Sequence, residues 1–360
     1  MNAISIVVLI FSVIGAADYL FGNRFGVGRE FEKAFSLFGP MALSMLGMLV
    51  LAPAIGVWLS PVFEGFYRLF GIDPSIIPAS FLANEMGGAP LAQSVCKSAT
   101  IGNYNAFVVS SMMGTVISFT LPFALGVVKQ EQRKELFFGL LCGIATIPTG
   151  CFAAGLVCGL DILTLLFNLM PLIILAVLVA AGLIFFPKIC IRGFGVFGSL
   201  MKAVAIAGLV CAVFTFLTKT EISPHFDTFE NAAFLCANAC VTLSGALPVM
   251  FLAAKLLDQP LNRMSSRIGI NGVSALAFLT CLATNVSSIS VLDRMNRKGA
   301  VLNAAFAVSA GGVFGGHLAF TMAMDSRYVA PMMVGKLVSG LFAVILALLI
   351  YKDGEEELTA

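Results

Sequence analysis

The sequence predicts an all-α polytopic membrane protein. Hydrophobic residues make up 59% of the 360 residues and charged residues only 11%, whereas a soluble globular protein carries about 25% charged residues because its surface faces water. Nine segments are apolar over the roughly 20 residues that a crossing helix needs, and two more are interrupted by polar residues. The net charge of +2 lacks the basic excess typical of nucleic-acid binding. We therefore expect lipid, and no nucleic acid, around the chain.

The nine apolar segments are, in chain order, 3–21, 39–59, 102–128, 135–158, 161–186, 202–218, 232–256, 300–324 and 329–350. The first lacks the basic start of a signal peptide, so we expect it to be retained as a span. Residues 24–38 are expected to form a mixed-charge loop. The interrupted segments, 74–95 and 272–292, could cross fully or re-enter as hairpins. Amphipathic stretches at 62–70 and 261–268 are typical of interfacial helices and precede them.

Positive charges distinguish the two topologies, because cytoplasmic loops carry the excess of Lys and Arg. Full crossing by both interrupted segments distributes the charges almost evenly. Re-entry by both gives fifteen positive residues on one side and four on the other. The fifteen are Arg24, Arg29, Lys33, Lys129, Arg133, Lys134, Lys188, Arg192, Lys255, Arg263, Arg267, Arg294, Arg297, Lys298 and Lys352, and the four are Arg68, Lys97, Lys219 and Arg327. We therefore predict nine crossings, with the N-terminus outside and the C-terminus cytoplasmic.

The two interrupted segments also indicate an internal repeat. FLANEMGGAPLA at 81–92 aligns with CLATNVSSISVL at 281–292, and flanking stretches match in the same order: 60–74 with 259–272, and 106–114 with 305–313. Five predicted crossings separate equivalent points, so the second copy is inverted. Inverted repeats whose broken helices meet near the midplane are typical of secondary transporters.

The repeat divides the chain into two units, each with four transmembrane helices and one re-entrant hairpin. The predicted divisions are unit 1 at 1–158 with hairpin 74–95, a linking transmembrane helix at 161–186, unit 2 at 193–352 with hairpin 272–292, and a cytoplasmic tail at 353–360.

Glu85 is the only charged residue between Pro74 and Val95. Irregular backbone at membrane depth is tolerated only inside protein or beside a water-filled cavity. We therefore place Asn84 and Glu85 at the tip of the first hairpin, with Gly87 and Gly88 as its hinge. A carboxylate there usually marks a substrate or ion path. The structural alternative is a Glu that is kept protonated or forms an ion pair with Lys97 or Lys336.

Thr284 and Asn285 occupy the matching tip of the second hairpin and carry no charge. The predicted cavity therefore has one anionic wall and one neutral, hydrogen-bonding wall. This combination favours a small cation that bears a polar group.

Further polar residues inside the spans are secondary candidates for the site. His317 lies among glycines in its span, and it could line the substrate path or be a hydrogen-bonded core histidine. Asp18 could instead reach the interface, Lys336 could extend to the outer interface along its apolar stem, and Asn105 could tie helices together. The nine cysteines have no C-x-x-C spacing and only two histidines accompany them, so we expect no metal, no cofactor and no disulfide framework.

Several longer motifs resemble one known family. They are MALSMLGMLVLAP (41–53), LANEMGG (82–88), SSMMGTVISFTLP (110–122), GIATIPTGC (143–151), NAAFAVSA with GGHLAF (303–320) and PMMVGKLVSG (331–340). The chain resembles the ethanolamine permeases of bacterial ethanolamine-utilisation operons along nearly its whole length. Glu85 stands where that pattern has Asp, and Gly316 stands where it has an acidic residue.

The resemblance implies import of ethanolamine, which is mostly an ammonium ion at neutral pH, across the bacterial inner membrane. A potential of 100 mV favours entry of one charge by about 2.3 kcal/mol, so a uniporter using alternating access suffices. The alternatives are an ion-coupled (H⁺ or Na⁺) transporter of another small polar or cationic solute, and a channel. No catalytic constellation suggests an enzyme, and the sequence leaves a homo-oligomer open.

Overall fold

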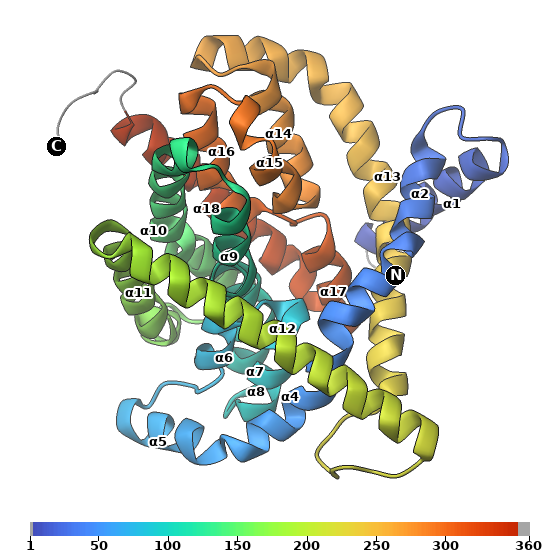
Figure 1. The fold of residues 1–360 in the computed structure, drawn as a ribbon, viewed down its shortest axis with the longest axis vertical. Helices are drawn as coiled ribbons and strands as arrows, with labels where there is room; N and C mark the ends of the chain where they lie inside the picture. The colour runs from blue at the N-terminus through green and yellow to red at the C-terminus, as the bar shows by residue number, and fades with distance from the viewer. Residues whose placement is uncertain (1–2, 352–360) are drawn as a thin grey trace.

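The computed structural model describes residues 3–351, without the side chains of Ala3, Asp258, Asn262, Arg263, Met264 and Ser266. Every regular element within these residues is helical (Figure 1), which confirms the all-α prediction. The predicted tail at 353–360 lies outside the described residues.

The α-helices are α1 (Ala3–Leu20), α2 (Val27–Ser36), α3 (Phe38–Met41), α4 (Gly47–Trp58), α5 (Ser60–Phe70), α6 (Ile76–Phe81), α7 (Gly88–Val95), α8 (Ala99–Tyr104), α9 (Leu121–Val127), α10 (Arg133–Val157), α11 (Ile162–Phe185), α12 (Pro187–Thr218), α13 (Phe229–Ile268), α14 (Gly272–Ala283), α15 (Asn285–Ser290), α16 (Arg297–Ala310), α17 (Gly316–Asp325) and α18 (Val329–Ile350). Three π-helices are η1 (Ala42–Leu46), η3 (Asn105–Gly114) and η4 (Val116–Thr120). Short 3₁₀-helices are η2 (Asn84–Met86), η5 (Gln130–Gln132), η6 (Leu292–Arg294) and η7 (Ser326–Tyr328).

Seven helical stretches in the described part of the chain are long and apolar enough to cross a membrane. They are Val27–Trp58, Ala99–Val127, Gln130–Val157, Ile162–Phe185, Pro187–Thr218, Phe229–Leu257 and Gly316–Ile350. These stretches correspond to seven of the nine predicted spans. The predicted first span forms α1, which is shorter than the other seven.

Three sequence-based expectations are wrong in detail. The segment 300–324 is not one span, because α16 ends at Ala310 and α17 begins only at Gly316. The expected loop at 24–38 contains helix α2, which continues through α3 and η1 into α4. The amphipathic stretch at 261–268 is the end of the 40-residue α13 rather than a separate helix. Only its counterpart at 62–70 lies in a helix of its own, α5.

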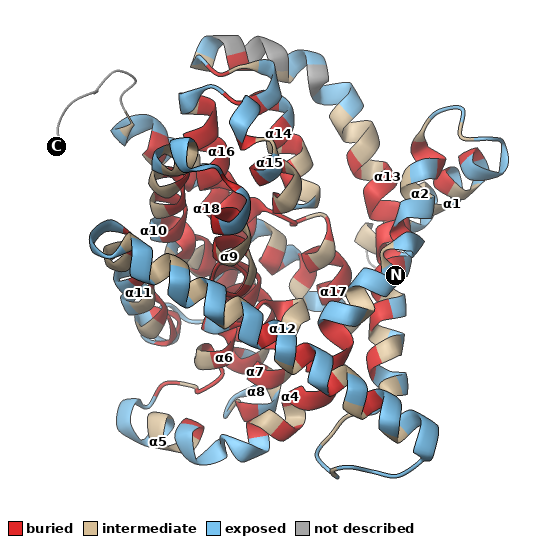
Figure 2. Cartoon of the chain, in the orientation of Figure 1, coloured by how far each residue is buried: buried red, intermediate tan, exposed pale blue. Residues whose placement is uncertain are grey.

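The centre of the bundle is formed by α10, α16, α18 and η3; α16 and η3 are almost wholly buried, whereas α10 and α18 also expose an outer face (Figure 2). Glycines allow these helices to approach closely, as is usual in membranes. A Cβ on Gly139 would collide with the Val301 carbonyl, and a Cβ on Gly150 would collide with the Gly335 carbonyl. Close packing of small residues therefore holds this core together.

A second group of helices, α1, α2 and α13, packs beside the core and lies on the right in Figure 1. Helix α13 contacts both of its partners and also reaches α17 of the core group. Helix α12 crosses the outside of the bundle and packs on α4, where Gly47 lies against the backbone of Ala205 and Leu209, and Gly208 lies against the Gly47 carbonyl. The outer faces of α11 and α12 expose apolar side chains (Figure 2), which suits contact with lipid.

The two ends of segment 74–95 lie side by side. Asp73 Oδ2 accepts hydrogen bonds from the backbone N–H groups of Lys97 and Ser98, both at 2.9 Å. Its Oδ1 accepts from the N–H and hydroxyl of Ser75 at the start of the segment. The Lys97 ammonium also pairs with Glu64 of α5. One aspartate therefore joins the beginning and the end of the segment.

The two ends of segment 272–292 are joined in the same way. The Asn271 side chain donates to the carbonyl of Arg294 (2.8 Å), and the Asn296 side chain donates to the carbonyl of Gly269 (2.8 Å). In Figure 1, α6 and α7 lie in the lower half of the molecule and α14 and α15 in the upper half. The two segments thus have similar bases at opposite ends of the bundle.

The first prediction concerns the base of segment 74–95. Asp73→Ala removes an acceptor of four hydrogen bonds, and each bond to a charged group contributes about 1.5–3 kcal/mol. We expect the midpoint of thermal unfolding of the protein in detergent to fall by several degrees. Asp73→Asn, which keeps one carbonyl oxygen, should lose less. An unchanged midpoint for Asp73→Ala would show that this aspartate does not hold the segment in place.

Candidate functional site

The tip of segment 74–95 is an interruption between two short helices. Helix α6 ends at Phe81, Leu82 and Ala83 are extended, and η2 then leads into α7. Ser110 Oγ donates to the Leu82 carbonyl at 2.7 Å, and the Ala83 N–H donates to Ser118 Oγ at 3.0 Å. Two serines of the π-helical stretch therefore satisfy backbone groups that the interrupted helix leaves free.

Both glycines predicted as the hinge are required by this geometry. Gly87 has a φ of 92°, a left-handed conformation that glycine adopts without steric cost. A Cβ on Gly88 would collide with the Leu82 carbonyl and the Ser110 hydroxyl. The turn that presents Glu85 thus depends on the absence of side chains at both positions.

The tip of segment 272–292 lies where α14 ends at Ala283 and α15 begins at Asn285. Its free carbonyls are satisfied by backbone rather than by side chains. The Gly312 N–H donates to the Cys281 carbonyl (2.9 Å), and the Phe314 N–H donates to the Leu282 carbonyl (2.8 Å). This pairing explains why the predicted span 300–324 is broken, because residues 311–315 leave the helix in a series of turns whose N–H groups reach the tip.

A cavity of about 370 Å³ lies at these interruptions. Both tips and the start of α17 contribute polar groups, α2 contributes Lys33, and residues 37–45 and α13 contribute mostly apolar side chains. The lining residues used below are Lys33, Glu85, Thr284, Asn285, Gly316 and His317. Four of the five residues predicted to bind substrate are therefore brought together; the fifth, Asn84, is fully buried behind them.

Glu85 and His317 face each other across this cavity. Glu85 Oε1 lies 3.8 Å from His317 Nε2, which is too long for a hydrogen bond. The Glu85 side chain is 22% exposed and that of His317 is 7% exposed. Glu85 Oε2 and His317 Nδ1 are buried and have no hydrogen-bond partner among the described residues. Such orphaned polar atoms are rare in folded proteins and are typical of a site that receives a ligand or water.

The neutral residues of the two tips are held by threonines of neighbouring helices. Asn285 Nδ2 donates to Thr120 Oγ1 at 2.8 Å, and Asn84 Nδ2 donates to Thr321 Oγ1 at 3.4 Å. Asn84 Oδ1 is a further buried acceptor without a partner in the described part of the chain. Thr284 caps α15 by accepting from the Val286 N–H (3.3 Å) and is exposed to the cavity.

Two secondary candidates lie outside the cavity lining and have structural partners. Asp18 accepts hydrogen bonds from the N–H groups of Phe25 (3.0 Å) and Gly28 (2.8 Å), and so joins α1 to α2. Asn105 exchanges side-chain hydrogen bonds with Asn168 and donates to Ser75 Oγ. It therefore ties the base of segment 74–95 to α11.

Lys336 does not extend to the outer interface, which was one of the alternatives considered from the sequence. It is 1% exposed, and its ammonium group donates to the Ser111 carbonyl at 2.7 Å. It lies behind the cavity rather than on its lining.

Sequence reasoning missed the residues that make the interruptions possible. Ser110, Ser118 and Thr120 are buried hydroxyls that pair with the tips. The signal for them was the unusual density of Ser and Thr in SSMMGTVISFT at 110–120, an otherwise apolar segment.

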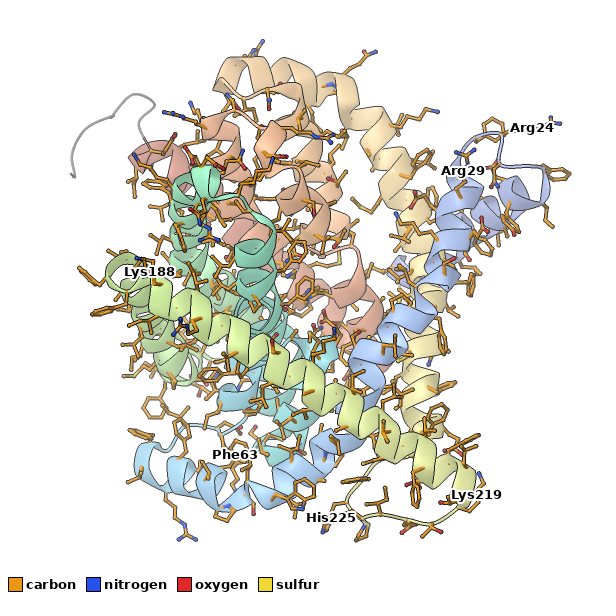
Figure 3. All side chains as sticks on the ribbon, viewed as in Figure 1. Arg24, Arg29, Phe63, Lys188, Lys219 and His225 are labelled. Atoms are coloured by element: carbon orange, nitrogen blue, oxygen red, sulfur yellow. The ribbon has the colours of Figure 1, made fainter. Side chains whose placement is uncertain are left out.

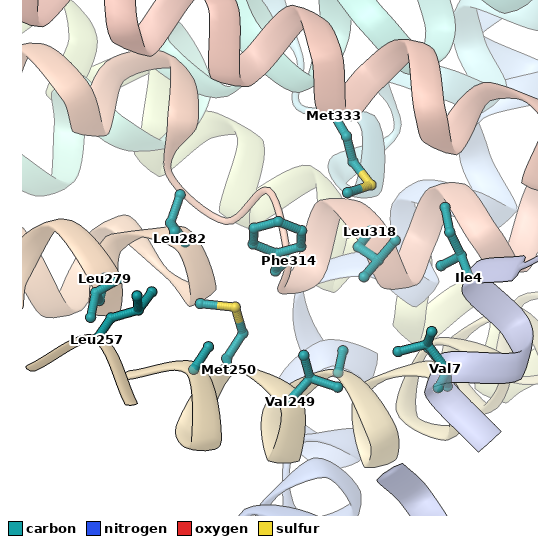
Figure 4. Close-up of a pocket in the computed structure, with 13 residues that line it drawn as sticks. Ile4, Val7, Val249, Met250, Leu257, Leu279, Leu282, Phe314, Leu318 and Met333 are labelled. Atoms are coloured by element: carbon teal, nitrogen blue, oxygen red, sulfur yellow. The ribbon is translucent and has the colours of Figure 1, made fainter. Parts of the chain in front are cut away.

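A second cavity, of about 380 Å³, lies between α1 and α13 on one side and α14, α17 and α18 on the other. Figure 4 shows its lining, which consists of apolar side chains such as Val7, Met250, Phe314 and Leu318. No side chain there can replace the hydration shell of an ion. The polar cavity at Glu85 is therefore the candidate site.

A helical membrane bundle whose broken helices surround a polar cavity has the architecture of a membrane transporter. The chain belongs to the family described as "Ethanolamine utilisation protein, EutH", whose model matches residues 1–350. It is 38% identical to the probable ethanolamine permease EutH of Listeria monocytogenes over 93% of this chain and 90% of that protein. It is 34% identical to the probable ethanolamine permease EutH of Salmonella typhimurium (93% and 89%) and to the uncharacterized protein YxeR of Bacillus subtilis (96% and 94%). No solved structure matches the chain.

The second prediction concerns Gly316, at the start of α17. A Cβ there would meet nothing within 4 Å, and an acidic residue is favoured at a helix N-terminus. Gly316→Asp should strengthen cation binding, because two unit charges some 8 Å apart interact by about 2 kcal/mol at an effective dielectric constant of 20. We expect the half-saturating concentration of ethanolamine in uptake assays to fall by about 3- to 10-fold, or about 0.7–1.4 kcal/mol. Gly316→Ala is the neutral control, and an equal effect of both substitutions would contradict the electrostatic explanation.

Proposed function

We propose that this protein imports ethanolamine in its ammonium form, and that Glu85 is the counter-ion of the substrate. The observation that carries the proposal is the Glu85 carboxylate itself, which lines a cavity inside an apolar bundle and has one buried oxygen without a hydrogen-bond partner among the described residues. A buried carboxylate is costly unless it is paired, and an ammonium ion supplies both the opposite charge and three donors.

The neutral wall of the cavity favours a substrate with a second polar group. Thr284 and Asn285 offer a hydroxyl and an amide opposite the acidic tip, and both can bond the hydroxyl of ethanolamine. Water occupies about 30 Å³ per molecule in the liquid, so a substrate of four heavy atoms fits the cavity with several waters. The names of the Listeria and Salmonella relatives agree with this choice.

The proposed architecture is an inverted repeat with two re-entrant hairpins. Its support is the joined bases of segments 74–95 and 272–292, which lie at opposite ends of the bundle. We assign unit 1 to 1–158, the linking helix to 161–186 and unit 2 to 193–352, with the N-terminus outside and the C-terminus cytoplasmic. Figure 3 shows Arg24 and Arg29 in the upper part of the molecule and Lys219 at its lower end, while Lys188, assigned to the same side as Arg24, lies near mid-height.

Alternating access is the proposed mechanism. The cavity extends to Lys33, which belongs to the side assigned as cytoplasmic. We therefore interpret this conformation as open to the cytoplasm. A potential of 100 mV supplies about 2.3 kcal/mol per charge, or roughly 50-fold accumulation, which suffices for a uniporter. The closeness of His317 to Glu85 favours proton coupling as the alternative, and uptake driven by a pH gradient at zero potential would identify it.

The third prediction tests the counter-ion. Glu85→Gln keeps the shape of the side chain but removes its charge, so the ammonium ion would be left unpaired in a partly dry site. We expect uptake of labelled ethanolamine into proteoliposomes at an inside-negative potential to fall at least about tenfold, which corresponds to 1.4 kcal/mol.

Glu64→Gln is the matched control, because Glu64 lies on the exposed helix α5 and its loss should leave uptake unchanged. If a well-folded Glu85→Gln protein transports like the unmodified protein, Glu85 serves the fold and not the substrate.

The fourth prediction tests the topology. Single cysteines at positions 68 and 97 in a cysteine-free background should both react with an impermeant reagent added outside cells. Cysteines at positions 129 and 297 should react only after the membrane is opened. Labelling of 68 and 97 from opposite sides would exclude re-entry of segment 74–95.

A further inference from the structure

Lys336 is a lysine enclosed within the core of the bundle. It is 1% exposed, and its ammonium group donates a hydrogen bond to the Ser111 carbonyl of η3 at 2.7 Å. No carboxylate in the described part of the chain lies within 4.0 Å of its ammonium nitrogen. A carbonyl is a neutral partner, so this contact holds the ammonium group in place without neutralising it.

Ser111 adjoins Ser110, whose hydroxyl donates to the Leu82 carbonyl of the tip that carries Glu85, so η3 connects Lys336 to that tip. Helix α17, which carries His317, contacts both η2 and α18, so these three elements bring Glu85, His317 and Lys336 into one cluster. Only Glu85 and His317 line the cavity. Lys336 therefore lies behind the site, where it cannot leave when substrate enters.

The charge of this cluster decides which step of a transport cycle senses the membrane potential. With His317 as the neutral imidazole, the negative charge of Glu85 and the positive charge of Lys336 sum to zero in the empty site. A bound ammonium ion raises the sum to +1. Without Lys336 the empty site would carry −1 and the loaded site zero.

We propose that Lys336 is the internal counter-cation of the Glu85 site, which keeps the empty transporter neutral so that it reorients without moving net charge. The inference rests on the proposed function, since it needs a cationic substrate at Glu85. The loaded step then carries the voltage dependence of import. Without Lys336, the voltage-dependent step becomes the reorientation of the empty transporter. That step must then move a buried and unpaired carboxylate.

The test compares net uptake with exchange in proteoliposomes that contain the full-length protein. Net uptake needs the empty transporter to return, whereas exchange of labelled for unlabelled ethanolamine, saturating on both sides, does not. We expect Lys336→Met to reduce net uptake at least tenfold and exchange less than threefold. Lys336→Arg retains the charge and should restore net uptake. Equal loss of both activities in Lys336→Met would overturn the proposal in favour of a purely structural lysine.

A second measurement needs no variant. Because the loaded step of the unmodified protein carries one charge, an imposed potential of 100 mV should slow its exchange by up to roughly threefold. If exchange is active but its rate does not change with the potential, the proposed role of Lys336 is wrong, while the proposed function stands. If the unmodified protein shows neither uptake nor exchange of ethanolamine, the proposed function fails and this inference fails with it.

Discussion

The site depends on one constraint: a helix interrupted inside an apolar bundle must find partners for the backbone groups it frees. The protein meets this constraint differently at its two tips. At the first, the hydroxyls of Ser110 and Ser118 pair with Leu82 and Ala83. At the second, the backbone of residues 311–315 pairs with Cys281 and Leu282. Without these bonds neither tip could remain open, and Glu85 would have no cavity to face.

The same constraint explains where small residues are indispensable. A Cβ on Gly114 would collide with the Leu82 carbonyl, and a Cβ on Gly315 would collide with the Ala283 carbonyl. Each tip is therefore pressed against the backbone of a neighbouring helix. Gly316, the next residue, has free space around it. Packing therefore excludes a side chain at position 315 but not at position 316.

Much of the fold and part of the site could be predicted because polar residues stand out in an apolar chain. Glu85 and the Thr284–Asn285 pair were found in this way, and the structure places them on one cavity. The break at residues 311–315 could not be predicted, because glycines that pack helices and glycines that free a backbone look alike in sequence. Only the distant carbonyls of Cys281 and Leu282 distinguish the two uses. The burial of Lys336 was missed for a similar reason, since its partner Ser111 lies 225 residues away in the chain.

Both cavities described above lie along the boundary between the α1–α2–α13 group and the core. The polar cavity is bordered by α2 and α13 on one side and by the two tips on the other. The apolar cavity is bordered by α1 and α13 on one side and by α14, α17 and α18 on the other. A boundary with voids gives up fewer packing contacts when its two sides separate than a close-packed one does. The core helices, by contrast, are locked by glycine contacts between backbones. If the transporter changes its accessibility by moving one body against another, this boundary is where the motion costs least. Glu85, His317 and Lys336 belong to η2, α17 and α18, none of which is part of the α1–α2–α13 group.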